Sequence, residues 1–226
     1  MIYENVKKAV FLNRPNRFIA NVELEGEEKV CHVKNTGRCK ELLICGTEVF
    51  VQHQKKPERK TEYDLIAVKK GDLLINMDSQ APNKVFFEWL EKEVYFKNIT
   101  FIKPECRYKN SRFDFYIEYS GKKAFIEVKG VTLENNGILM FPDAPTERGL
   151  KHINELCLCK AEGYEAYVFF VIQTEKAKYF TPNKKTHKDF ADALILAKKC
   201  GVGIKALNCK TKPDFLEINE FVEVRL

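Results

Sequence analysis

The sequence lacks the features that mark membrane and secreted proteins. No apolar run approaches the about 20 residues that a membrane-spanning helix needs. The N-terminal stretch MIYENVKKAVFLNRP contains neither the apolar core nor the small-residue cleavage site of a signal peptide. We therefore expect a cytoplasmic protein without a membrane partner.

The eight cysteines do not form a recognisable metal motif. There is no Cys-x-x-Cys pair, and no histidine stands at zinc-ligand spacing from a pair of cysteines. Because thiols stay reduced in the cytoplasm, we expect most of them to fill small apolar gaps. The sequence gives a zinc site little support.

The composition is that of an ordinary soluble protein. The chain has 226 residues, of which 45% are hydrophobic and 31% charged, enough for one large or two small domains. The net charge is +6. A mildly basic chain is compatible with nucleic-acid binding but does not by itself indicate it.

The most informative stretch is SRFDFYIEYSGKKAFIEVKGV, residues 111–131. Apolar residues alternate from Phe113 to Tyr119, with the period of a half-buried strand. A second alternating run follows Ser120-Gly121, which is a turn signal. The pattern predicts a β-hairpin.

The hairpin brings three charged side chains together. If the turn is Ser120-Gly121, Tyr119 pairs with Lys122, and the same register puts Asp114 opposite Glu127. Opposed residues have Cβ atoms about 4.5–5.5 Å apart, and residues two apart share a face. Asp114, Glu127 and Lys129 are therefore predicted to converge as two carboxylates and an ammonium.

Two opposed carboxylates repel each other and tend to hold a proton or a cation. Oxygen ligands suit Mg²⁺, and a nearby lysine can orient a water or neutralise charge on a phosphate. Asp…Glu-x-Lys on adjacent strands resembles the PD-(D/E)xK nuclease superfamily. The alternative is an exposed hairpin face with a Glu–Lys pair.

Short strands fill the first eighty residues and favour a small, OB-like β-barrel. The expected strands are 17–24, 29–33, 47–52, 63–68 and 73–76. A loop between the second and third of these carries Asn35, Thr36, Arg38 and Lys40, whose polar and basic groups could contact phosphate. A plain turn is the alternative for this loop.

Residues 78–83 mark the expected junction between domains 1–81 and 82–226. Beyond it we predict a helix with Asn83 as its N-cap, an edge strand at 101–108, the hairpin, a helix at 146–162 and a buried strand at 166–173. This order fits a restriction-endonuclease-like α/β domain with a mixed central sheet.

Several long segments resemble the sugar fermentation stimulation protein A family. These are CHVKNTGRCKELL, SRFDF, FIEVKGVTL, FPDAPTERGLKHINEL and AEGYEAYVFFVIQ. The resemblance spans about residues 17–173. It implies an N-terminal OB-like domain, a PD-(D/E)xK nuclease-like domain, DNA binding and an influence on sugar-utilisation genes.

By position, the resemblance assigns the catalytic roles to Asp114, Glu127 and Lys129. The literal Pro-Asp motif is absent, because Arg112-Phe113 precedes Asp114. Glu88 matches an extra acidic metal ligand of this fold, with Glu105 as its rival.

Basic groups that follow the hairpin complete the expected site. Arg148, Lys151 and His152 come from the helix after the active strands, and with Arg112 they are expected to bind nucleic acid. Generic helix polarity is the alternative for these residues.

Two functions follow. The first is a Mg²⁺-dependent (or Mn²⁺-dependent) nuclease, in which Asp114, Glu127, the Val128 carbonyl and Glu88 hold the metal and the barrel grips DNA, with a leaning towards single strands. The second is a DNA-binding transcriptional regulator of sugar metabolism with a non-catalytic nuclease-like core. A small-molecule binder has little support, and a homo-oligomer stays open.

Overall fold

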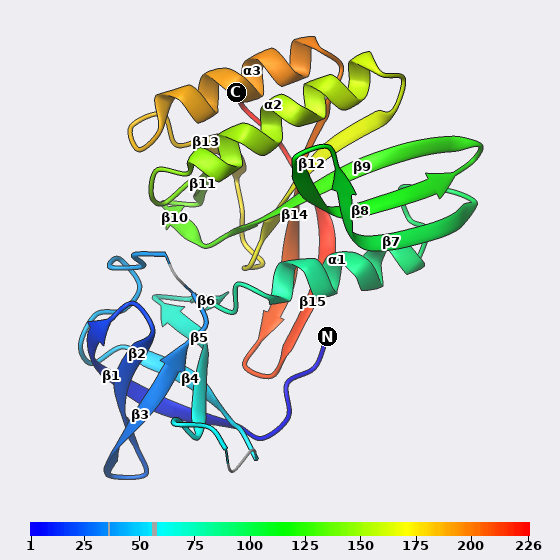
Figure 1. The fold of residues 1–226 in the computed structure, drawn as a ribbon. Coiled ribbons are helices and arrows are strands. Elements are labelled where there is room, and N and C mark those ends of the chain that lie inside the picture. The colour runs from blue at the N-terminus through cyan, green and yellow to red at the C-terminus, as the bar shows by residue number, and fades with distance from the viewer. Residues whose placement is uncertain (36, 56–57) are drawn as a thin grey trace.

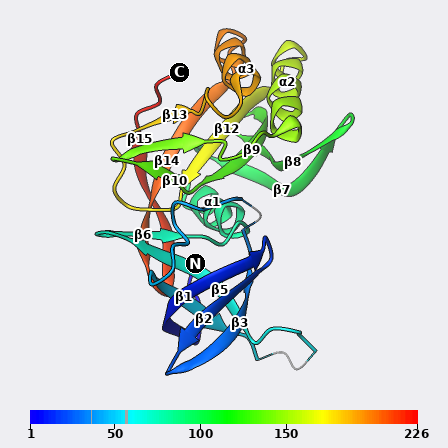
Figure 2. The same ribbon diagram turned by 90° about the vertical axis from the view of Figure 1, so that its left-hand side faces the viewer.

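The computed structural model describes residues 1–35, 37–55 and 58–226 of the chain. It contains an N-terminal closed barrel and a larger mixed sheet flanked by helices (Figure 1). In Figures 1 and 2 the barrel lies below the layered part, with β6 and α1 at the junction. No helix in the described ranges is long and apolar enough to cross a membrane.

The barrel has the OB-like architecture expected from its short strands. Its strands are β1 (Val6–Asn16), β2 (Ile19–Leu24), β3 (Glu27–Val33), β4 (Glu48–His53), β5 (Tyr63–Lys70) and β6 (Leu73–Asn76). They follow the order β3-β2-β1-β4-β5-β6, and parallel pairing of β3 with β5 closes the barrel. The alternating residues Ala20, Val22 and Leu24 point into its core.

Strand β1 is absent from the sequence prediction. Only Ala9 and Phe11 of this strand are buried. The lysines before them and the polar residues after them interrupt the apolar alternation that would mark a strand. The strand forms because β2 and β4 pair with its two edges. Its position therefore depends on tertiary partners rather than on local pattern.

The second part is built on a six-stranded sheet of order β15-β14-β12-β9-β8-β7. Its strands are β7 (Ile99–Tyr108), β8 (Ser111–Tyr119), β9 (Lys122–Val131), β12 (Glu165–Ile172), β14 (Gly203–Lys212) and β15 (Phe215–Val222). Strand β12 runs parallel to β9 and β14, whereas the outer pairs are antiparallel. The mixed sheet confirms the predicted fold class.

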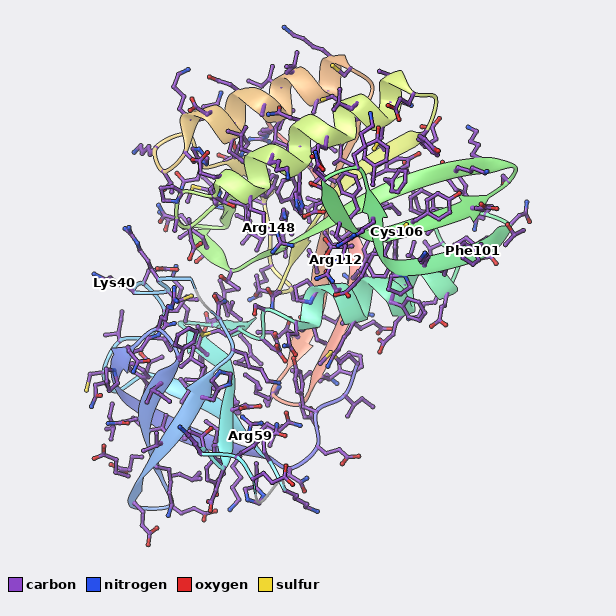
Figure 3. The ribbon with its side chains drawn as sticks, in the orientation of Figure 1. Lys40, Arg59, Phe101, Cys106, Arg112 and Arg148 are labelled. Carbon is purple, nitrogen blue, oxygen red and sulfur yellow. The ribbon has the colours of Figure 1, made fainter. Side chains whose placement is uncertain are left out.

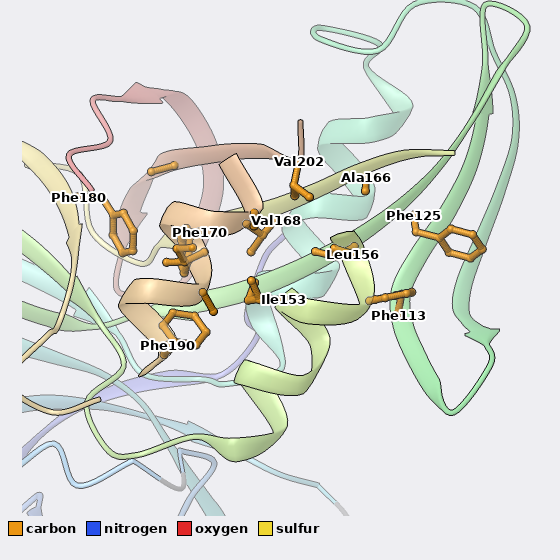
Figure 4. Packing of buried hydrophobic residues seen from close by; sticks show 14 of the residues in the cluster. Phe113, Phe125, Ile153, Leu156, Ala166, Val168, Phe170, Phe180, Phe190 and Val202 are labelled. Atoms are coloured by element: carbon orange, nitrogen blue, oxygen red, sulfur yellow. The ribbon is translucent and has the colours of Figure 1, made fainter. Parts of the chain in front are cut away.

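Helices cover both faces of this sheet. Helix α1 (Ala81–Glu91) lies on one face, and α2 (Glu147–Ala161) and α3 (Lys188–Lys199) lie on the other (Figure 1). A small sheet of β10 (Leu133–Asn135), β11 (Ile138–Phe141) and β13 (Tyr179–Pro182) adjoins them. Figure 4 shows Phe113, Ile153 and Phe170 in the core beneath α2 and α3.

The helix starts differ in part from prediction. Thr146, the first residue of the predicted helix, is the N-cap of α2, and its hydroxyl accepts a hydrogen bond from the Gly149 N–H at 3.1 Å. Helix α1 begins earlier than predicted, with Gln80 at its N-cap position, so Asn83 lies inside the helix. The side-chain amide of Asn83 is thereby freed for another contact, described below.

A buried polar network joins the two parts. The Lys34 ammonium lies 3.1 Å from the Asp78 carboxylate, which has no exposed surface. The Gln173 amide donates to the Asn76 side chain at 2.9 Å and to the Asp78 carbonyl at 3.0 Å. Because buried polar groups are costly without partners, these bonds hold β6 and the following turn against the end of β12.

Candidate catalytic site

The register of the central hairpin is the one predicted from its turn. Tyr119 pairs with Lys122, and the ladder continues to Phe115 opposite Ile126. The next pair in this register is Asp114 and Glu127. There the backbone ladder between β8 and β9 stops, and the Asp114 side chain takes over the contact with β9.

Asp114 is held by two hydrogen bonds from different elements. Its Oδ2 accepts from the Val128 N–H of β9 at 2.7 Å, and its Oδ1 accepts from the Asn83 amide of α1 at 2.8 Å. Burial, with the nearby charge of Glu127, raises the pKa of Asp114 above its ordinary value. Burial is the larger cause of this rise, and the charge of Glu127 adds to it.

Glu127 is buried, with 2% of its surface exposed. Its Oε1 lies 2.6 Å from the Nδ1 of His152 on α2 and also forms an ion pair with the Lys129 ammonium. Burial alone would raise the pKa of Glu127, but the His152 hydrogen bond and the Lys129 charge outweigh it and hold that pKa below its ordinary value.

The second oxygen of Glu127 has no partner. Oε2 is buried and makes no hydrogen bond within the described residues. An unpartnered buried carboxylate oxygen costs free energy and calls for a proton donor or a cation. The structure therefore contains one orphan acceptor beside the carboxylate pair.

The donor set at this point suits a hard divalent cation. Each Asp114 oxygen accepts one hydrogen bond and keeps a lone pair, and the Val128 carbonyl points to the same side of β9 as its N–H. The described part of the chain brings together no group of three or more His, Cys, Asp or Glu side chains that could form a full cage. Two carboxylates, a carbonyl and waters are a ligand set that Mg²⁺ accepts.

The structure does not bring Glu88 to the carboxylate pair, which corrects the expectation of a ligand there. Its Oε2 lies 2.7 Å from the N-terminal ammonium of Met1. Glu88 comes five residues after Asn83, which turns it about 140° around the helix away from Asp114. Asn83 therefore occupies the place on α1 that was expected of an acid.

Glu105, the rival of Glu88, does not take that role either. It lies on β7, its side chain is exposed, and its carboxylate is 3.3 Å from the Arg112 guanidinium. Arg112, expected to bind nucleic acid, thus forms an exposed ion pair in the structure.

The structure buries His152, which was expected at the nucleic-acid surface. Its ring is buried, packs at an edge against Phe113 and contacts Glu127. Lys151 is exposed, donates to the Asn110 carbonyl at 3.0 Å and faces Glu155. Arg148 is exposed on the first turn of α2 (Figure 3).

The basic loop of the barrel reaches the second part of the molecule. The Asn35 side chain accepts from the Gly37 N–H at 2.8 Å, and the Arg38 N–H donates to Asp143 at 3.0 Å. The side chains of Arg38 and Lys40 are exposed. Thr36, also expected at this surface, lies outside the described residues.

Asn83 and the contact of His152 with Glu127 are the parts of the site that sequence reasoning missed. Asn83 precedes a helical pattern, so it carries the signal of an N-cap, and no local feature reports its contact with Asp114. The sequence pattern predicts nucleic-acid binding for His152 and not its contact with Glu127, because packing decides which face of α2 meets β9.

Family models match the chain in two consecutive blocks. The SfsA N-terminal OB domain matches residues 12–77, and the sugar fermentation stimulation protein RE domain matches residues 80–215. Sugar fermentation stimulation protein homologues from Ruminiclostridium cellulolyticum and Clostridium beijerinckii are each 59% identical over 226 residues, covering 100% of both chains.

A solved structure agrees over the same length. Pyrococcus furiosus SfsA in complex with Ca²⁺ matches with a TM-score of 0.91 at 28% identity, covering 100% of this chain and 98% of that one. With two matching domain models, full-length relatives and a shared fold, this chain belongs to the sugar fermentation stimulation protein (SfsA) family.

Proposed function

We propose that this protein is a phosphodiesterase that cleaves DNA with the help of a divalent cation, Mg²⁺ or Mn²⁺. The observation that carries the proposal is Glu127, a buried carboxylate that has one oxygen held by Lys129 and His152 and the other left without a partner. The neighbouring Asp114 adds a second carboxylate, so two acidic groups stand beside one lysine, an imbalance that a cation would offset.

Asp114, Glu127 and the Val128 carbonyl would hold the cation. A bound Mg²⁺ would supply Lewis-acid stabilisation of the phosphate and lower the pKa of a water. The relative from Pyrococcus furiosus, described in complex with Ca²⁺, supports the choice of a hard divalent cation. Asn83 and the Val128 N–H would keep the Asp114 carboxylate in one orientation.

Lys129 is the group that would meet the reacting phosphate. Its side chain is 17% exposed, and its ammonium contacts the buried Glu127 carboxylate. From there it can donate a hydrogen bond to the attacking water or to a phosphate oxygen on which charge develops. His152 contacts Oε1 of Glu127 and so fixes the orientation of the carboxylate, which leaves Oε2 as the oxygen without a partner.

The second candidate is a DNA-binding regulator in which the same cluster has no catalytic role. One observation favours it: Lys129 and His152 already contact Glu127 in the structure, so the carboxylate is stabilised without a cation. The two candidates share DNA binding and differ only in turnover.

A cleavage assay separates them. Purified protein is incubated with end-labelled single-stranded and duplex DNA in Mg²⁺, Mn²⁺, Ca²⁺ or EDTA, beside Glu127→Gln, which keeps the shape of the side chain but removes its charge. The nuclease proposal expects products from the wild type in Mg²⁺ or Mn²⁺, none in EDTA and none from Glu127→Gln. DNA binding without products in every metal would support the regulator instead.

A further inference from the structure

A basic hollow lies on the barrel, and neither Asp114 nor Glu127 is among the residues that line it. It has a volume of about 410 Å³, and its lining contains three arginines and a lysine but no carboxylate. The residues that line it are Arg14, Asn16, Arg17, Gly37, Arg38, Lys40 and Leu43. It is formed where the turn between β1 and β2 meets the loop after β3.

Arg14 builds this hollow and does not serve as a free cation. Its guanidinium donates to four backbone carbonyls: Gly37 at 3.0 Å, Arg38 at 2.9 Å, Arg17 at 2.7 Å and Asn35 at 2.8 Å. These bonds tie the two loops together. Because the fork of an arginine is rigid, it fixes the spacing between the loops.

The other cations of the hollow are available. Arg17, Arg38 and Lys40 are exposed, and none of them forms an ion pair within the part of the chain that the structure describes. Three unpaired cations around one hollow create an attraction for an anion.

An aromatic ring contacts Arg17, one of the arginines that line the hollow. Phe18 is 43% exposed, and the Arg17 guanidinium stacks over its ring at 4.6 Å from the centroid. A single exposed phenylalanine is common on protein surfaces. A ring stacked with an arginine beside two further cations is the combination that binds an unpaired base and its phosphates.

The hollow is connected to the proposed catalytic part. The Arg38 N–H donates to Asp143, which precedes α2, and Arg148 is exposed on the first turn of that helix. Figure 3 shows Lys40 on the side of the barrel that faces the second part of the molecule, and it shows Arg148 on that second part. A strand held on the barrel would thus be directed towards the helix beside the carboxylate pair.

We propose that Arg17, Phe18, Arg38 and Lys40, here called the barrel patch, bind single-stranded DNA by stacking one base and neutralising the adjacent phosphates. This inference rests on the proposed function and names its substrate as unpaired DNA. Duplex DNA offers phosphates but no free base face, so Phe18 should contribute to binding of single strands only.

The test is binding measured without a divalent cation. Fluorescence anisotropy in EDTA follows a labelled thymidine oligomer of about 20 nucleotides and a duplex of the same length at several salt concentrations. The variants are Phe18→Ala and the double change Arg38→Ala/Lys40→Ala. The control is Lys122→Ala/Lys123→Ala, which removes the same charge from the exposed tip of the β8–β9 hairpin.

Phe18→Ala should raise the Kd for the single strand about 5- to 10-fold and leave the duplex unchanged. Arg38→Ala/Lys40→Ala should weaken single-strand binding at least tenfold and lower the slope of log K against log salt by about 1.4, for two lost phosphate contacts. The control should change Kd less than twofold. Thermal unfolding checks that each variant is folded.

The inference fails if the patch variants bind single strands as the control does, or if Phe18→Ala weakens single-strand and duplex binding equally. This failure is distinct from that of the proposed function. Cleavage with intact metal dependence but unchanged binding by the patch variants would overturn the patch alone. Binding that maps to the patch without cleavage in any metal would overturn the nuclease alone.

Discussion

His152 Nδ1 and Glu127 Oε1 lie 2.6 Å apart, in a contact between α2 and β9 that is closed to solvent. The contact leaves the second oxygen of Glu127 as the free acceptor of the site. It therefore links the packing of a helix to the orientation of a carboxylate that we propose to be catalytic.

Changing His152 should affect both stability and the site. His152→Ala leaves the buried Glu127 oxygen without its imidazole partner and should lower the free energy of unfolding by about 1–3 kcal/mol. His152→Gln can restore a hydrogen-bond donor and should recover part of that loss. Urea unfolding of both variants measures the difference, and equal stability of wild type and His152→Ala would contradict the assigned contact.

Asn83 gives a test of the excess negative charge at Asp114. Asn83→Asp puts a third carboxylate where the amide now donates at 2.8 Å, so it should lower Tm in EDTA. The added acid should also increase the rise in Tm on adding Mn²⁺ or Ca²⁺, because more charge is then neutralised. A loss of about 1 kcal/mol corresponds to about 2–4 °C for a chain of this size.

Asn83→Ala is the matched variant, since it removes the hydrogen bond without adding charge. It should lower Tm slightly and should not increase the response to cations. If Asn83→Asp responds to Mn²⁺ no more than wild type, the cation does not bind beside Asp114.

Asp64 in the barrel makes stability depend on pH. It has no exposed surface, and it contacts Arg59, Lys34 at 3.4 Å and the Gln54 amide at 2.9 Å. Burial opposes ionisation, but the Arg59 hydrogen bond and the Lys34 charge outweigh it, so the pKa of Asp64 falls below its ordinary value of 3.8. An acid whose pKa is lowered by folding stabilises the folded state at pH values above its ordinary pKa of 3.8. This stabilisation is lost as the pH falls through the pKa of the folded state.

Asp64→Asn should therefore lower the free energy of unfolding by about 1–3 kcal/mol at neutral pH. The difference from wild type should shrink when the pH falls below 3.8. Asp72→Asn, a change at an exposed turn, is the control and should leave the free energy of unfolding at neutral pH unchanged. A difference that grows on acidification would contradict the sign of this linkage.

The sequence predicted the hairpin and the convergence of Asp114, Glu127 and Lys129 because two local signals agree there. Alternation sets which residues share a face, and a two-residue turn sets the register. The contact of Lys129 with Glu127 follows directly from this spacing. The catalytic roles of the three residues stay a prediction.

Contacts set by helix packing could not be predicted in the same way. Glu88 and Asn83 both stand on α1, and a start three residues earlier than expected, together with the docking of the helix, decides which one meets Asp114. His152 likewise reaches Glu127 only because α2 docks on β9 through that face. No short-range signal in the chain reports these orientations.

The most direct test of the central claim is the initial rate of DNA cleavage by Lys129→Ala in saturating Mg²⁺ or Mn²⁺. Its ammonium contacts Glu127, the carboxylate that would help to hold the metal in the proposed mechanism. We predict that the wild type cleaves single-stranded DNA and that the variant, folded and still able to bind DNA, is slower by about 10²–10³-fold. A variant that cleaves as fast as the wild type would contradict the account.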